Sequence, residues 1–425
     1  MTVTKLALLL VVFVDVMGQG LIFPIINTLM LDTDRAFLPE ATPMATRHFN
    51  YGLVMAVFYV AWFLGAAYIS KVSDMIGRKP SILICLAGAF LGYVLTILAL
   101  MYNSLWLLVL GRAITGFTAG NQPIAQAALV DISADEADRA RNMGLVMVAM
   151  SLGLIAGPVI GGVLSDQAII GAFASLQLPF YAAGGLIAAT AVLVAAVFTD
   201  AYQPKKPLRF EPLEIFLVLW RATGRPVVLR IAIVFFLYEI VLNTFYIFMD
   251  TFLTERFSYG TFGTSMAMLV FGACLAFSGA FLVPFFRSRM SMRMIVYVAQ
   301  SLIGLCCIAF VLAPTGLMSF LPVVVIGLAF GVGYPTLLAI FSLSVGEDEQ
   351  GWVMGVSMAL FTLGAAMTSL IGGEAMGIEM RLPFLYAAAL SIVSLLAIRI
   401  LWAFPGVRTI VSRQPAGRPV AEPEP

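Results

Sequence analysis

Charged side chains, histidine and cysteine are all scarce in this chain of 425 residues. Only 11% of the residues are charged, whereas an ordinary soluble domain carries roughly 25%. The chain therefore lacks the polar surface that it would need to face water on every side. Its net charge of +1 gives no reason to expect a nucleic-acid partner.

Catalytic constellations are also missing from the sequence. The single histidine, His48, falls in a polar stretch that we interpret as a loop, which argues against a histidine metal site and against His-dependent hydrolysis. The four cysteines all fall inside apolar runs, where they serve as small hydrophobic residues and not as a disulfide framework. Without a zinc motif, a Ser/His pair or a nucleotide-binding P-loop, we expect no enzyme, no cofactor and no metal.

Long apolar runs make up most of the chain, with 61% hydrophobic residues and a mean hydropathy of +1.00. A bilayer core of ~30 Å takes about 20 apolar residues as a helix, so we predict an all-α membrane protein with twelve transmembrane helices. The first run is too long for a signal peptide. The predicted spans are 6–30, 50–70, 81–101, 105–130, 142–164, 179–198, 228–250, 262–286, 294–313, 318–341, 352–373 and 383–403.

Lys and Arg are distributed unevenly over the connections between these spans. An even number of spans places both termini on one side of the membrane. That side carries 19 of the 24 Lys and Arg residues, and the opposite side carries four. Because positive residues mark cytoplasmic loops, we predict that both termini are cytoplasmic.

The predicted spans fall into two halves. An N-terminal six-helix bundle covers 1–198, a cytoplasmic linker 199–227, a C-terminal six-helix bundle 228–404 and a cytoplasmic tail 405–425. The linker is rich in proline and charge. The tail is rich in Pro and Arg and is expected to be disordered.

A glycine pattern repeats at an offset of 211 residues. It places Gly116 and Gly120 of the first half on Gly327 and Gly331 of the second. The same offset matches Met143-Gly144 with Met354-Gly355, Gly153 with Gly364, and Gly161-Gly162 with Gly372-Gly373. Since the register holds without a gap over about 47 residues, we expect two pseudo-symmetric six-helix bundles, as in rocking-type transporters.

Several segments carry motifs of one known family. They are Gly65 with Ser70–Pro80, Gly111-Arg112 with Gly116, Leu129–Ser133 with Arg139–Gly144, Gly153–Gly162, Leu86–Ala89, and Asp15–Pro24. Gly65 with Ser70–Pro80 resembles the loop signature of the major facilitator superfamily. Gly111-Arg112 with Gly116 is similar to the buried arginine motif of this superfamily, and Gly153–Gly162 resembles its antiporter motif. Asp15–Pro24 is similar to the start of the tetracycline/proton antiporters. The chain is thus identified as a member of the twelve-span drug/proton antiporter group, mainly from its N-terminal half.

The chain also departs from the tetracycline exporters. Ser70 and Met75 replace the usual Gly and Arg of the loop signature, and Gly92 stands where these exporters carry an acidic residue. Span 294–313 has no acidic residue, although those exporters have one there. The resemblance therefore implies the major facilitator fold and proton-coupled transport, but not tetracycline as the substrate.

Asp15 and Glu239 are acidic residues inside predicted spans, where a charge costs about 2.5–3.5 kcal/mol on insertion scales. If either faces a cavity, protonation removes this cost and the residue can carry protons. The position of Glu239 in span 228–250, which corresponds to that of Asp15 in span 6–30, supports the same role for it. A permanently charged carboxylate bonded to a neighbouring helix is the alternative for each. Arg112 cannot lose its charge. By resemblance it anchors a hydrogen-bond network near the proton carrier, and a structural tie between helices is its alternative.

Polar side chains within the spans are the candidates for substrate binding. Their amide and hydroxyl groups can bind polar groups of a substrate, or can join neighbouring helices instead. Asp250 is a weaker candidate, because it could simply lie at the outer end of its span. The candidate substrate-binding residues are Gln19, Asn121, Gln122, Gln126, Asn243 and Tyr238.

Two further groups take their expected roles from the resemblance. Charges at helix ends can separate and rejoin as the halves move, or can simply be solvated. Small residues at four-residue spacing let helices approach closely. The conformational-switch candidates are Asp74, Gly77, Arg78 and Asp131, and the antiporter motif comprises Gly153, Gly157, Pro158, Gly161 and Gly162.

These features together predict a secondary transporter that exports a small amphipathic organic compound in exchange for protons, by alternating access. A proton-coupled symporter or a facilitator of a metabolite or siderophore uses the same fold and is the alternative. A substrate-sensing receptor would not explain carboxylates in both halves. The expected partners are a small-molecule substrate, protons and the lipid bilayer, and the resemblance implies a monomer in the inner (plasma) membrane.

Overall fold

The computed structural model describes residues 2–33, 37–200 and 214–412. Within these residues, 11 helices are long and apolar enough to cross a membrane. They are α1 (Val3–Leu31), α2 (Met44–Ile76), α3 (Arg78–Met101), α6 (Glu136–Ser165), α8 (Leu178–Val197), α10 (Pro226–Phe257), α11 (Thr261–Phe277) with η3 (Ser278–Leu282) and α12 (Val283–Arg287), α13 (Met292–Leu312), α14 (Gly316–Leu343), α15 (Gln350–Ile378) and α16 (Leu382–Leu401). The prediction of a many-spanning α-helical membrane protein is confirmed.

The predicted span 105–130 differs from the others because it is two helices. They are α4 (Leu105–Phe117) and α5 (Asn121–Asp131), separated by a short turn. Neither is long enough to cross a membrane alone, so the count of twelve spans stays a prediction. The remaining short helices are α7 (Gln167–Ile170), η2 (Gly171–Phe173), α9 (Glu214–Thr223), η4 (Glu347–Glu349) and α17 (Pro405–Val411).

The predicted linker and tail are described only in part. Residues 201–213 of the linker and 413–425 of the tail lie outside the described residues. The later part of the linker forms α9. The first part of the tail, which was expected to be disordered, forms α17 instead, because Val407 and Val411 are buried and hold it against the protein.

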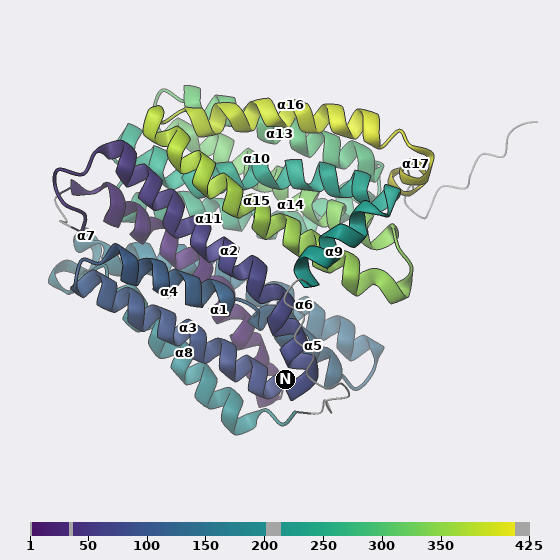
Figure 1. Ribbon diagram of the computed structural model, residues 1–425, viewed down its shortest axis with the longest axis horizontal. Helices are drawn as coiled ribbons and strands as arrows, with labels where there is room; N and C mark the ends of the chain where they lie inside the picture. The colour runs from purple at the N-terminus through teal and green to yellow at the C-terminus, as the bar shows by residue number, and fades with distance from the viewer. Residues whose placement is uncertain (1, 34–36, 201–213, 413–425) are drawn as a thin grey trace, which may run out of the picture. The chain divides into compact units, whose positions relative to one another are not determined.

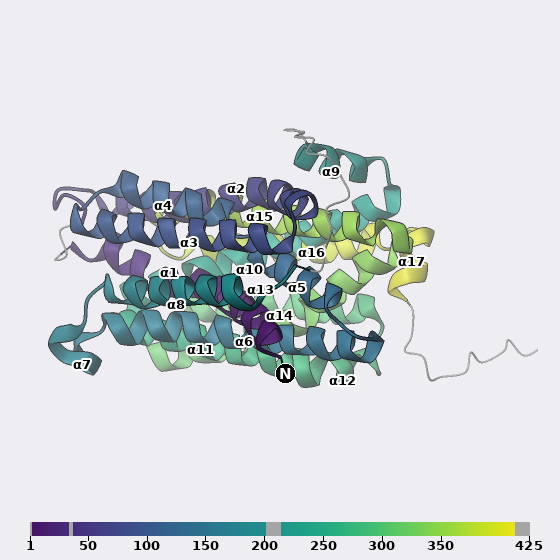
Figure 2. The ribbon, with the colours of Figure 1, turned by 90° about the horizontal axis from the view of Figure 1, so that it is seen from below.

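The chain clusters into two compact units. The first comprises Met1–Ile215, Asn243–Gly272 and Phe361–Pro383, and the second comprises Phe216–Leu242, Ala273–Leu360 and Phe384–Pro425. In the first unit α1 runs along α6, and α3 lies against α4 and α8 (Figure 1, Figure 2). In the second unit α13 packs along α14. The predicted domain boundaries and the symmetry between the halves stay predictions.

His48 lies in α2 and not in a loop, which corrects the interpretation of this residue from the sequence. It is 3% exposed, and its Nε2 is 2.8 Å from Oε1 of Glu255 on α10. The stretch before the apolar core of α2 looked like a loop because it is polar. The helix begins earlier, at Met44, where Arg47 donates to three backbone carbonyls and His48 contacts Glu255.

Candidate functional site

The turn between α4 and α5 is the structural feature around which the candidate site is built. Thr118 Oγ1 donates a hydrogen bond to the Ile114 carbonyl at 2.9 Å. The N–H of Gly120 bonds to the carbonyl only two residues back, and Pro123 has no N–H to offer. The helix therefore stops at Phe117, and α5 begins anew with N–H groups that lack partners inside the helix.

A small cavity lies beside this turn, inside the first unit. Its polar lining consists of Asp15, Gln19, Tyr93, Arg112, Thr115 and Asn121. The cavity measures about 30 Å³. A volume of ≳ 10–15 Å³ holds one water molecule, whereas a drug-sized ligand needs roughly 300–1,000 Å³. In this conformation the cavity therefore has room for water or a proton, but not for an organic substrate.

Asp15 is half-buried on α1 and faces the start of α5. Its carboxylate accepts from the backbone N–H of Gln122, the second residue of α5. The N-terminus of a helix carries a partial positive charge and favours a carboxylate there. The broken span thus gives Asp15 a backbone partner. No side-chain pattern in the sequence could have located it, although the glycines and Pro123 were signals of a break.

Arg112 on α4 is 3% exposed, and its guanidinium carbon lies 4.0 Å from the ring centroid of Phe58. A cation over an aromatic face is attracted by the ring. Within the described residues, the buried Nε atom has no hydrogen-bond partner. The family resemblance implied a hydrogen-bond network around Arg112, which stays a prediction. The structure adds the contact between its guanidinium and the Phe58 ring of α2.

The cavity gathers only part of the predicted site. Asp15, Gln19, Arg112 and Asn121 line it together, from α1, α4 and α5. Gln122 instead donates from Nε2 to the sulfur of Met150 at 3.3 Å. The other predicted residues do not line this cavity. They are Gln126, which is half-buried on α5, Asn243, which is buried on α10, and Tyr238 and Glu239, which are fully buried on α10.

Glu239 and Tyr238 lie in the second unit. Both side chains are 0% exposed. The Tyr238 ring stacks on Phe330 of α14, with 6.4 Å between ring centroids, and Gly333 leaves room for its hydroxyl. Tyr238 is therefore a packing residue here, as the commoner behaviour of buried aromatic side chains would predict.

The predicted switch residues do meet at one place, where α2 joins α3. Arg78 Nη1 lies 2.7 Å from Asp74 Oδ1, and Arg78 Nε lies 3.3 Å from Asp131 Oδ2 at the end of α5. Gly77 has φ of 102°, which favours glycine. One arginine thus holds the ends of α2 and α5 together. Exposed ion pairs contribute little free energy of folding, so this contact is suited to breaking and re-forming.

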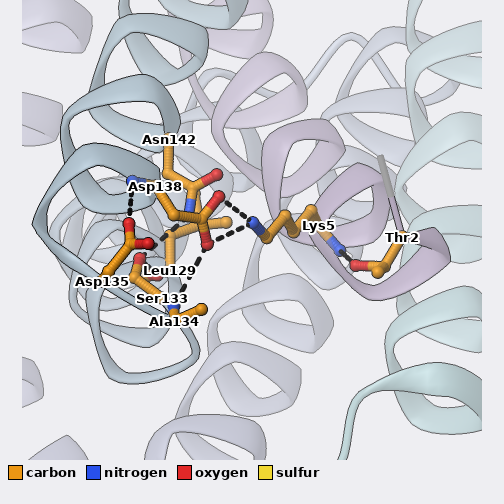
Figure 3. A network of polar contacts seen from close by, with 8 residues as sticks. All are labelled: Thr2, Lys5, Leu129, Ser133, Ala134, Asp135, Asp138 and Asn142. Carbon is orange, nitrogen blue, oxygen red and sulfur yellow. Dashed lines mark hydrogen bonds and ion pairs between the residues drawn. The ribbon is translucent and has the colours of Figure 1, made fainter.

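A second polar network nearby was not foreseen from the sequence (Figure 3). Lys5 Nζ of α1 lies 2.6 and 2.7 Å from the two carboxylate oxygens of Asp138 on α6. Asp138 also accepts from the N–H of Ala134, and Asn142 donates to Ser133 at 2.9 Å. The start of α1 is therefore attached to the turn between α5 and α6, next to the arginine contact of Asp131.

The motif glycines of α6 pack against the backbone of α1. A Cβ at Gly153 would lie 2.7 Å from the Phe13 carbonyl oxygen, and one at Gly161 would lie 2.8 Å from that of Leu21. Gly157 faces the Met17 carbonyl in the same way, and a Cβ at Gly162 would collide with Ser265. Pro158 lies inside the helix against Gly20. The expected close helix approach is thus observed, while the role in antiport stays a prediction.

Metal binding finds no support in the part of the chain that the structure describes. No group of three or more His, Cys, Asp and Glu side chains there is placed to hold a metal ion.

Many apolar helices around a small cavity with a carboxylate and a buried guanidinium define a multi-pass membrane protein of the transporter class. A family model of the Major Facilitator Superfamily matches residues 8–369. The chain belongs to this superfamily.

Curated relatives and a solved structure agree with this assignment. The tetracycline resistance protein, class C, of Escherichia coli is 29% identical and covers 91% of this chain and 94% of its own. The class D protein of Salmonella ordonez is 30% identical over 84% of this chain and 85% of its own. The crystal structure of a D-xylose-proton symporter has a TM-score of 0.72 at 13% identity, covering 96% of this chain and 99% of that one.

Proposed function

We propose that this protein is a proton-coupled exporter of a small amphipathic organic compound. It works by alternating access, with twelve spans in two six-helix halves and with α4 and α5 together forming the fourth span. Both termini lie on the cytoplasmic side of the cell inner membrane. The observation that carries the proposal is the cavity shared by Asp15, Arg112 and the start of α5.

Asp15 is the proposed proton-coupling residue in this cavity, with Arg112 beside it. When ionised, the carboxylate is attracted by the positive end of α5. A proton on Asp15 removes this attraction, so it loosens α1 from α5. This change in free energy is what a proton gradient needs in order to move a two-state transporter from one state to the other. Glu239 is proposed as a second carrier, in the other half of the protein.

The substrate binds in the wider form of the same cavity. Gln19 and Asn121 already line it, and Gln122, Gln126 and Asn243 of the first unit would add polar contacts once the helices part. Tyr238 lies in the second unit, and a contact between it and the substrate stays a prediction. A Cβ at Gly92 would collide with the side chain of Thr115. An acidic residue at this position, as the tetracycline exporters carry, therefore has no room, and we propose a substrate other than tetracycline.

Two contacts at helix ends would release the motion. Arg78 with Asp74 and Asp131, and Lys5 with Asp138, join the ends of α1, α2, α5 and α6. Such pairs are weak enough to separate during each cycle. The curated relatives named above are resistance proteins, which supports export over import.

The test is a transport assay in proteoliposomes that contain a pH-sensitive dye and experience an inward proton gradient. Amphipathic drugs, siderophores and metabolites are added in turn. We expect substrate-dependent proton flux, and we expect Asp15→Asn to reduce it to the leak of empty vesicles. Glu239→Gln runs in parallel, and Glu136→Gln, an exposed carboxylate, is the matched control.

The outcomes of this assay distinguish proton-coupled export from proton-coupled import and from uncoupled transport. If the substrate moves in the same direction as the proton, the protein is an importer (a symporter) and not an exporter. If substrate moves while both Asp15→Asn and Glu239→Gln transport normally without proton flux, the coupling mechanism is wrong and the protein is a facilitator.

A further inference from the structure

Two polar contacts join α2 and α10 at the end of the first unit where α2 begins. His48 Nε2 lies 2.8 Å from Glu255 Oε1, and three residues further along α2 the Tyr51 hydroxyl lies 3.2 Å from Asp250 Oδ1. Residues three apart share one face of a helix. The two contacts therefore form consecutive steps from the end of the unit toward its interior.

Asp250 has a buried carboxyl group whose two oxygens differ in their hydrogen bonds. Its side chain is 0% exposed. Oδ1 accepts from the Thr251 N–H at 2.7 Å and from the Thr251 hydroxyl at 3.3 Å. Oδ2 is buried and, among the described residues, has no hydrogen-bond partner. A full negative charge on this group would leave one oxygen uncompensated, which costs much more free energy than a neutral acid in the same place.

The Tyr51 hydroxyl has only one proton to donate, but it has two acceptors in reach. The Ile247 carbonyl lies at 2.6 Å and Asp250 Oδ1 at 3.2 Å. A phenol donates one hydrogen bond and accepts others, so the shorter contact receives the proton. The hydroxyl oxygen then presents a lone pair to Asp250 Oδ1, and Oδ1 can donate to it only when that oxygen carries a proton.

The same geometry fits an ionised Asp250 after one rotation. The Tyr51 O–H would turn from Ile247 to the carboxylate and donate to it, without movement of either helix. The hydroxyl therefore has a hydrogen-bond partner for each protonation state of Asp250. A purely structural carboxylate would need only one of them.

The His48–Glu255 pair lies between this group and the end of the unit. The Glu255 side chain is 16% exposed and that of His48 is 4% exposed. The Nδ1 atom of His48 is buried without a hydrogen-bond partner within the described ranges. An imidazole with one nitrogen on a partly exposed carboxylate and the other nitrogen buried can pass a proton inward.

Two arginines at this end are engaged with other groups. Arg47 is buried, but its guanidinium donates to the carbonyls of Thr42, Met30 and Pro39. Arg256 lies over the rings of Phe252 and Phe257.

Three groups on the surrounding helices interact electrostatically with the pair of Tyr51 and Asp250. Tyr246 on α10 interacts with Asp250, and Tyr59 on α2 interacts with Tyr51. Arg112 on α4 also interacts with Tyr51. The other titratable groups here are Asp32 at the end of α1 and the exposed Glu374 on α15.

We propose that Asp250 is a further proton-binding site besides Asp15 and Glu239, which Tyr51 supports in both protonation states and which is loaded through His48 and Glu255. Its ligand is the proton. The inference rests on the proposed function only where it makes this site part of the coupling between proton flow and substrate transport. Proton binding at Asp250 can be tested without any substrate.

The first test uses infrared difference spectra of the purified protein between high and low pH, in which a protonated carboxyl group gives a separate C=O band. We expect Asp250→Asn to lose one such band. Tyr51→Phe should retain the band at a shifted frequency, because it loses its hydrogen-bond partner. Glu379→Gln, an exposed carboxylate paired with Arg381, is the control and should leave this band unchanged.

A wild-type set of carboxyl bands in Asp250→Asn overturns the proposal. If Asp250→Asn does not fold, as its melting temperature would reveal, Tyr51→Phe carries the test by itself. A shifted band then supports the site, and an unshifted band rejects it. His48→Gln tests the route: the band should respond to a pH jump more slowly, by roughly tenfold or more, and an unchanged rate rejects loading through His48.

Proteoliposome flux separates this proposal from the proposed function. If Asp250→Asn loses the band while no substrate drives proton flux in the wild type, the site stands and the proposed function fails. If Asp15→Asn abolishes flux while Asp250→Asn retains both its flux and the band, the function stands and the site fails.

Discussion

Two stretches related by the 211-residue offset have adopted different structures. Residues 105–131 form α4, a turn and α5, whereas residues 316–343 form one continuous helix, α14. The glycines correspond: Gly116 and Gly120 match Gly327 and Gly331. Proline alone does not explain the break, because α14 contains Pro322 and Pro335 and continues through both.

The polar residues are what distinguish the two stretches. Arg112, Asn121 and Gln122 correspond to Val323, Val332 and Gly333. Thr118, whose hydroxyl takes up a carbonyl before the break, corresponds to Ala329. The two glycines are thus repeated in both stretches, while the arginine and the two amide side chains occur only in the first. A broken helix exposes backbone N–H groups, and only the first stretch has a carboxylate, Asp15, to use them.

The largest difference between the two stretches is expected for the pair Arg112 and Val323. Arg112→Gln removes the buried guanidinium of the cavity and should reduce substrate-driven proton flux by roughly 100-fold, the equivalent of about 3 kcal/mol. Val323→Ala removes two buried methyl groups and should cost about 1–2 kcal/mol of folding stability, with flux per folded molecule unchanged. Proteoliposome flux and melting temperatures measure both.

Equal losses of flux in these two variants would contradict the comparison, because they would make the second stretch as important for coupling as the first. Lys at position 112 provides the matched control. Partial flux in Arg112→Lys would mean that charge matters, and full loss would mean that the planar group over Phe58 is required.

A smaller difference is expected for Gly120 and Gly331. A Cβ at Gly120 would meet only side-chain atoms of Ile69, the nearest being Cγ2 at 2.8 Å, whereas one at Gly331 would meet Ser278 and the Leu275 carbonyl oxygen at 3.0 Å. A single side chain can shift more easily than a backbone carbonyl that is held in a helix. Gly331→Ala should therefore lower stability by about 1–3 kcal/mol, and Gly120→Ala by less, as thermal unfolding in detergent will measure. The reverse order would mean that the turn, and not the continuous helix, is the tighter contact.

The smallest effect is expected just beyond the two stretches, at two glycines that the same 211-residue offset relates. Gly144 and Gly355 are both exposed in helices, and a Cβ at either would meet no heavy atom within 4 Å. Replacing glycine by alanine inside a helix gains roughly 0.5–1 kcal/mol. Gly144→Ala and Gly355→Ala should each raise the melting temperature slightly and equally. A loss of transport in only one of them would reveal that its glycine is needed for motion.

The sequence determined the class, the positions of eleven spans and the family, because each of these depends on composition and on short-range pattern. Twenty apolar residues must form a helix in a bilayer, and the four-residue spacing puts Gly153, Gly157 and Gly161 of α6 on one face. Gly162, which was expected on the same face, packs against Ser265 of α11 instead. The contact of Arg78 with Asp74 and Asp131 was also expected, because the family resemblance assigned the three residues to one charge cluster.

Only the tertiary structure decided which polar groups share a site. It divided span 105–130, brought Asp15 to the backbone of Gln122, placed Phe58 under Arg112, and paired Lys5 with Asp138, which lies 133 residues away. It also moved His48 from an expected loop into a buried contact. A hydrogen bond or ion pair depends on the direction of a side chain and on what fills the space opposite, and neither is written in the spacing of residues along the chain.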